Sequence, residues 1–236
     1  MKKFFSILGM ASLICLSLVI SKKTTTVVQD MDELMIEIKN KEKDYYVEPI
    51  DAIINNNQIV PGLNGRKVNV KKSYDEIKKI GTFNDKYLIY EDIKPNITSK
   101  GNYDKVIISG NKNKNMITLM FNVYANDDIT DIVNILKKKN VSATFFIDGA
   151  WFEKNNEYVL KLIKDGYTIG NLGYNNDYSK TEFVWMNNIL KKIGKQKINY
   201  CYDTDNIYNL NSCINQKNYT IKPSILIKDN PLIEIK

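Results

Sequence analysis

Apolar strand-like segments alternate with amphipathic helix-like segments from Asn115 onward. The strand-like segments are residues 116–123, 142–148 and 167–172, and the helix-like segments are residues 127–140 and 157–166. The apolar positions of the first helix-like segment share one face: Ile129, Ile132, Val133 and Leu136. Strand, helix and strand repeated at this spacing predict parallel βαβ units of the α/β class, with helices outside a sheet or barrel.

Functional groups in parallel α/β folds gather at the carboxyl ends of the strands, because the loops that follow them meet at one edge. Here those ends fall at residues 122–127, 148–151 and 171–177. We expect the functional site at these three loops.

Four regions are predicted along the chain. They are a signal peptide or membrane anchor at 1–23, a stalk or linker at 24–58, a small accessory α+β region at 59–114 and the main domain at 115–236. Within the stalk, Leu34, Met35 and Ile38 recur at helical spacing and predict a short amphipathic helix. In the accessory region, Ser73 followed by Glu76 predicts a helix that begins with a capping box.

The N-terminus has the pattern of an export segment. Two lysines precede an uncharged, mostly apolar run of 18 residues from Phe4 to Ser21, and two more lysines follow it. That run is just long enough to cross a bilayer as a helix, so we expect an extracytoplasmic protein that is membrane-anchored or secreted. In that compartment Cys201 and Cys213 are free to form a disulfide, although two free, buried cysteines fit the sequence equally well.

The basic charge of the chain comes almost entirely from lysine. The net charge is +7, but Arg66 is the only arginine and the lysines are scattered singly or in short runs. A lysine-rich solvated surface accounts for this pattern better than a nucleic-acid site, which usually includes arginine forks. We expect no nucleic-acid partner.

One long segment carries a family resemblance. Residues 135–171, which include VSATFFIDG at 141–149 and DGYTIGN at 165–171, resemble the core of the polysaccharide deacetylases, the NodB homology family of carbohydrate esterases. The resemblance implies a distorted (β/α) barrel that acts on exported glycans such as peptidoglycan or chitin. The family's last strand and helix would follow where this chain stops, so the barrel is expected to be incomplete.

The catalytic motifs of the family map onto residues that cannot do the chemistry. The family's Thr-Phe-Asp-Asp-Gly motif falls on residues 120–124, which puts Asn122 at the general-base position and Val123 at the metal-carboxylate position. The His-Ser-x-x-His motif falls on residues 172–176, where Leu172 and Asn176 replace the two histidine ligands. Because metal-assisted deacetylation needs a bound cation and a basic group, the resemblance implies a pseudoenzyme without catalytic residues, metal or cofactor.

Several polar and aromatic residues near the strand ends are candidates for glycan contact. The family's Arg-Pro-Pro-Tyr-Gly stretch is weakly matched by residues 199–203, in which the tyrosine is kept. Aromatic rings stack on sugar faces and amides bond to hydroxyls, but the same residues also serve as core and turn residues. The candidates are Tyr124, Trp151, Tyr174, Asn175 and Tyr202.

Three functions remain open at this level. The first is a pseudoenzyme that binds cell-wall glycan or an envelope protein. The second is an active hydrolase with a displaced carboxylate metal site, for which the aspartates near the strand ends are candidates. These are Asp127, Asp128, Asp148, Asp177, Asp203 and Asp205. The third is a purely structural envelope or sporulation protein, which a cleft filled by Val123 and Leu172 would favour.

Overall fold

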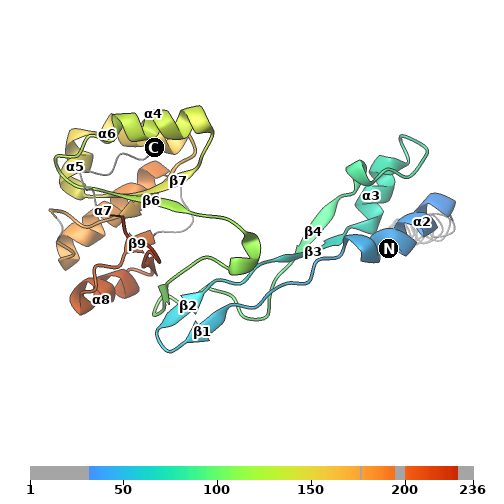
Figure 1. The fold of residues 1–236 in the computed structure, drawn as a ribbon, viewed down its shortest axis with the longest axis horizontal. Coiled ribbons are helices and arrows are strands. Elements are labelled where there is room, and N and C mark those ends of the chain that lie inside the picture. The colour runs from blue at the N-terminus through green and yellow to red at the C-terminus, as the bar shows by residue number, and fades with distance from the viewer. Residues whose placement is uncertain (1–31, 176, 195–199, 228–236) are drawn as a thin grey trace, which may run out of the picture. The chain divides into compact units, whose positions relative to one another are not determined.

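The computed structural model describes residues 32–175, 177–194 and 200–227, and the chain folds into two compact units (Figure 1). The first unit contains residues 32–50 and 64–94, and the second contains residues 51–63 and 95–227. No helix in these described ranges is long and apolar enough to cross a membrane. The expected membrane segment at 1–23 lies outside the described residues.

The first unit packs two helices beside a two-stranded sheet. Helices α2 (Glu33–Lys41) and α3 (Val70–Ile77) accompany the antiparallel strands β3 (Gly65–Val68) and β4 (Tyr90–Ile93), with short 3₁₀ turns η1 (Glu42–Tyr45) and η2 (Asp85–Tyr87). Its buried core comprises Met35, Ile38, Val68, Tyr74, Ile77 and Leu88. The amphipathic helix predicted in the stalk is therefore present as α2, and its apolar face is buried in a folded unit.

The predicted capping box at Ser73 is wrong. Helix α3 begins one turn earlier, with Asn69 as its N-cap accepting a hydrogen bond from the Lys72 backbone N–H at 3.0 Å. Ser73 is fully buried inside the helix, and its hydroxyl exchanges hydrogen bonds with the backbone N–H and carbonyl of Ile89. A tertiary contact to the segment before β4 therefore takes the hydroxyl that the sequence pattern assigns to the helix end.

The second unit is built on an eight-stranded sheet with the order β1-β2-β5-β10-β9-β8-β7-β6. Its strands are β1 (Ile53–Asn55), β2 (Gln58–Val60), β5 (Val106–Ile107), β6 (Leu119–Val123), β7 (Ala143–Ile147), β8 (Thr168–Asn171), β9 (Tyr200–Tyr202) and β10 (Tyr219–Ile221). Its helices are α4 (Thr130–Lys139), α5 (Gly149–Lys154), α6 (Asn156–Lys164), α7 (Lys180–Gly194) and α8 (Ile207–Asn215), with a 3₁₀ turn η3 (Lys112–Lys114). Among the described strands of this sheet, β1 and β2 alone pair antiparallel, so the expected βαβ architecture is confirmed.

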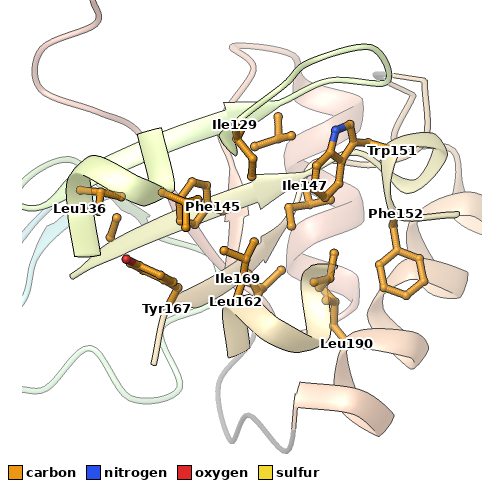
Figure 2. Packing of buried hydrophobic residues seen from close by; sticks show 14 of the residues in the cluster. Ile129, Leu136, Phe145, Ile147, Trp151, Phe152, Leu162, Tyr167, Ile169 and Leu190 are labelled. Carbon is orange, nitrogen blue, oxygen red and sulfur yellow. The ribbon is translucent and has the colours of Figure 1, made fainter. Parts of the chain in front are cut away.

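The main core lies between this sheet and its helices, as Figure 2 shows. Phe145 and Ile147 project from β7 and Ile169 from β8 toward Leu136 of α4 and Leu162 of α6. All five side chains are at most 5% exposed. Burial of each large apolar side chain contributes roughly 1.5–3 kcal/mol, so this layer provides much of the stability that holds the strand ends in place.

The sheet is extended by strands that come from before residue 115. Strand β10 pairs with β5, which pairs in turn with β2 of the β1-β2 hairpin. The structure shows an open strand order with β1 and β6 at its edges, and a closed barrel is not seen among the described strands. Residues 51–63 and 95–114 thus belong with the main sheet, so the expected boundary at residue 115 does not coincide with the division between the units.

Candidate functional site

Three polar side chains meet at the carboxyl ends of β6 and β9. The Asn122 amide nitrogen lies 3.5 Å from the Tyr124 hydroxyl oxygen, and the same amide lies near the Tyr202 hydroxyl. Asn122 and Tyr202 are half-buried, whereas Tyr124 is 42% exposed. Partial burial raises the pKa of the Tyr202 hydroxyl, and the nearby Asn122 amide partly offsets this. The group offers neutral donors, acceptors and ring faces to a ligand.

Val123, at the former metal-carboxylate position, belongs to the hydrophobic core. Its side chain is fully buried in the same cluster as Ile129, Phe145 and Trp151. Its carbonyl oxygen accepts the backbone N–H of Asp148 at 3.0 Å, which fixes the end of β6 against the loop after β7. An isopropyl group in this environment cannot hold a cation.

The former histidine motif forms a tight turn. Tyr174 and Asp177 exchange two backbone hydrogen bonds of 2.9 Å, and Asn175 adopts the left-handed conformation with φ 49°. Gly173 also has a positive φ, and an added Cβ there would lie 2.3 Å from the Asp177 carbonyl oxygen. Leu172 is fully buried. Asn176 lies outside the described residues.

Two of the expected glycan-contact residues are engaged in packing. Trp151 is 3% exposed, and its indole N–H donates to the Asp127 carbonyl at 2.8 Å. Its ring therefore cannot present a face to a sugar, which contradicts that expectation. Tyr174 packs edge-on against Trp185 of α7, and its hydroxyl donates to the Glu153 carboxylate at 2.7 Å. That hydrogen bond raises the pKa of Tyr174.

A buried asparagine network supports the strand ends. The Asn171 amide on β8 donates to Asn187 of α7 at 2.9 Å and to the Phe183 carbonyl at 3.0 Å. Asn187 in turn exchanges side-chain hydrogen bonds with Asn218, which precedes β10. All three asparagines are fully buried. No local sequence pattern predicts this network, because its members are far apart in the chain.

A disulfide between Cys201 and Cys213 joins β9 to α8. Both residues are buried, and they cluster with Tyr178 and Phe183. The Tyr178 hydroxyl donates to the Tyr202 carbonyl at 3.2 Å, and burial raises the pKa of Tyr178 strongly. The sequence left open whether these two cysteines are bonded or free, and the structure shows them bonded. The bond holds β9, the strand that carries Tyr202, against α8.

The aspartates near the strand ends mostly stabilise turns and helix ends. Asp148 caps α5 by accepting the Ala150 backbone N–H at 2.9 Å, and it is 1% exposed. The others accept local backbone hydrogen bonds or form an ion pair. These contacts involve Asp127 with Tyr124, Asp128 with Thr130, Asp177 with Ser179, Asp203 with Asp205, and Asp205 with Lys222. Within the described residues, no group of three or more His, Cys, Asp or Glu side chains could hold a metal ion.

The chain has relatives among known proteins. The family model "Polysaccharide deacetylase" matches residues 109–204. The uncharacterized protein YlxY of Bacillus subtilis (strain 168) is 36% identical over 178 residues, which are 74% of this chain and 56% of that protein. The chain thus spans just over half the length of this curated relative.

Solved structures of one relative resemble the fold. The wild-type BA3943 protein of Bacillus anthracis, described as a CE4 family pseudoenzyme, matches with a TM-score of 0.60 and 26% identity, over 81% of this chain and 73% of that one. A mutant of BA3943, described as having restored enzymatic activity, matches with a TM-score of 0.58 and 25% identity, over 80% and 75% of the two chains. Together with the motif positions, these matches identify residues 109–204 as a degenerate polysaccharide deacetylase domain.

Proposed function

We propose that this protein is a catalytically inactive polysaccharide deacetylase homologue that binds cell-envelope glycan. The main support is the convergence of Asn122, Tyr124 and Tyr202 at the strand ends. Asn122 occupies the general-base position of the family and carries an amide there. The amide and phenol groups suit sugar hydroxyls, and Tyr124 leaves part of its ring open to solvent. The group contains no side chain basic enough to activate water near neutral pH.

The description of BA3943 as a pseudoenzyme supports this reading, since that protein shares the fold of the present chain. The proposed location is extracytoplasmic, by anchoring or secretion. The N-terminal apolar run and the buried Cys201–Cys213 disulfide favour it, because disulfides persist mainly in oxidising compartments.

A titration with chitin and peptidoglycan oligomers, followed by calorimetry or by NMR, tests the proposal. We expect saturable binding that weakens in Tyr202→Phe and Asn122→Ala. The exposed Tyr208 of α8 provides a matched control, because Tyr208→Phe removes a phenol hydroxyl outside this group. Absence of binding to every oligomer would contradict the proposal.

A structural envelope protein is the second candidate, and one observation favours it. Leu172 and Val123 are both fully buried, so these two of the family's metal-ligand positions do not open to solvent. Two hollows in this unit, of about 490 Å³ beside α6 and about 240 Å³ beside β5 and β10, are lined by other residues. If this chain captures an envelope protein in a pull-down experiment and binds no glycan oligomer, the result would support a structural role over glycan binding.

A further inference from the structure

The hollow of about 240 Å³ lies where β5, β9 and β10 end. Asp203 directly follows β9, and its backbone N–H donates to the Ile221 carbonyl at 2.9 Å. Lys222 directly follows β10, and its backbone N–H donates to the Ile107 carbonyl at 2.8 Å. These backbone bonds hold both charged residues at the carboxyl edge of the sheet. The hollow is therefore positioned by regular strands, as parallel α/β binding sites usually are.

The hollow carries one net negative charge. Its lining includes the carboxylates of Asp203 and Asp205 and the ammonium of Lys222. Lys222 forms an ion pair with Asp205, and this hydrogen bond raises the pKa of Lys222. Asp203 has no ion-pair partner within 4 Å among the residues that the structure describes. Asp203 is half-buried and interacts with Lys222 only at longer range, so its carboxylate can receive a cationic group from a ligand.

A tight turn holds the two carboxylates together. One oxygen of Asp203 accepts the backbone N–H of Asp205 at 3.0 Å, and Asp205 itself adopts a left-handed conformation with φ 59°. A non-glycine residue in that conformation is strained and persists because its surroundings hold it. The charge arrangement is thus built into the loop between β9 and α8.

The rest of the lining is suited to a sugar ring. Gln58 contributes an amide to the lining, and Ile207 and Leu210 of α8 contribute apolar surface. Amides bond to hydroxyls, and the C–H face of a pyranose packs on aliphatic groups. The volume is below the roughly 300–1,000 Å³ typical of drug-sized ligands, which suits a group the size of one saccharide unit.

We propose that this hollow binds a sugar unit that carries a free ammonium group, such as a glucosamine residue within a glycan. Asp203 pairs with the ammonium, while Gln58 and the aliphatic wall of α8 contact the ring. The inference rests on the proposed glycan-binding function, and it adds a preference for de-N-acetylated over N-acetylated units. Tyr202 immediately precedes Asp203, and the Asp203 charge contributes to the raised pKa of Tyr202, so the hollow is near the group formed by Asn122, Tyr124 and Tyr202.

The test is a calorimetric titration of the whole exported chain with glucosamine oligomers and with N-acetylglucosamine oligomers of equal length. We expect the glucosamine oligomer to bind about tenfold more tightly, the factor given by one well-placed charged hydrogen bond. Asp203→Asn should abolish this preference, because the amide keeps the shape of the side chain and removes its charge. Asp131→Asn, which removes an exposed carboxylate on α4, should leave the preference unchanged.

The possible outcomes separate the two proposals. Binding of both oligomers with equal affinity, sensitive to Tyr202→Phe, would overturn the ammonium preference and leave glycan binding standing. A preference that survives Asp203→Asn would also overturn the assignment of this hollow. Free lysine serves as an amine without a sugar ring, and binding of lysine as tight as that of the oligomer would contradict the role of the ring. Binding of neither oligomer would overturn both proposals.

Discussion

The Asn122 amide lies near the Tyr202 hydroxyl and acts to lower its pKa, so the carboxyl ends of β6 and β9 come together although β7 and β8 separate these strands in the sheet. Proximity across two intervening strands is consistent with the twist of such a sheet. The general-base position of the family therefore lies within this polar group, although it carries an asparagine.

If this pair belongs to a ligand site, removing either partner should weaken glycan binding. Tyr202→Phe deletes one hydroxyl and should lower the affinity by about three- to tenfold, the range expected for one neutral hydrogen bond. The dissociation constant for a chitin oligomer, measured by calorimetry, gives the result. An unchanged constant in both Tyr202→Phe and Asn122→Ala would exclude this group as the binding site.

Two adjacent positions of the family's catalytic motif should differ in how well they tolerate a carboxylate. Val123→Asp places a charge in the dry core and should lower the free energy of unfolding by about 3 kcal/mol or more. Asn122→Asp is its matched control, since Asn122 is half-exposed among hydroxyl groups, and it should cost less than about 1 kcal/mol. Urea denaturation measures both, and equal effects would show that Val123 does not face the core.

The asparagine network should be essential for stability. Asn187→Ala leaves the Asn218 amide without its side-chain partner in a buried position, and the expected cost is about 2–3 kcal/mol. The neighbouring Asn188 is exposed on the same helix, so Asn188→Ala should be neutral or slightly stabilising because alanine favours helix. Thermal unfolding of the two variants distinguishes them. A cost at Asn188 as large as at Asn187 would point to helix α7 in general and would contradict a specific role for the network.

The disulfide should contribute measurably to folding. Reduction, or the Cys201→Ala/Cys213→Ala double variant, should lower the free energy of unfolding by about 3 kcal/mol, as expected for a short closed loop. The double variant is its own control, because a reducing agent should shift the unfolding of the natural protein and leave that of the variant unchanged. The whole chain has a third cysteine, Cys15, so labelling of three free thiols instead of one in the unreduced, unfolded protein would show that the bond is not formed.

Local patterns in the sequence predicted much of the fold. The aromatic and β-branched run at 142–148 became β7, and the helical spacing of Ile129, Val133 and Leu136 became α4. The short strand β10 was not predicted, because its three residues lack an apolar run and its partner β5 lies far earlier in the chain. Pairing between distant short segments depends on the whole fold, which local propensity does not report.

The candidate site was predictable in position and less so in detail. The alternation of strands and helices predicted a strand end at residues 122–127, and β6 does end at Val123. Tyr202 came from the weak motif match at 199–203, and it is the last residue of β9. The sequence did not reveal that Trp151 is turned into the core by its bond to the Asp127 carbonyl. The asparagine network was missed for the same reason as β10, because its members converge only in the tertiary structure.

The most direct test of the central claim is an acetate-release assay on acetylated chitin oligomers and peptidoglycan with the purified protein and added Zn²⁺, Co²⁺ or Mn²⁺. We expect no release above that of the metal ions alone, because the base and ligand positions hold Asn122, Val123, Leu172 and Asn176. Metal-dependent acetate release that is lost when one of the strand-end aspartates is changed to asparagine would contradict the account.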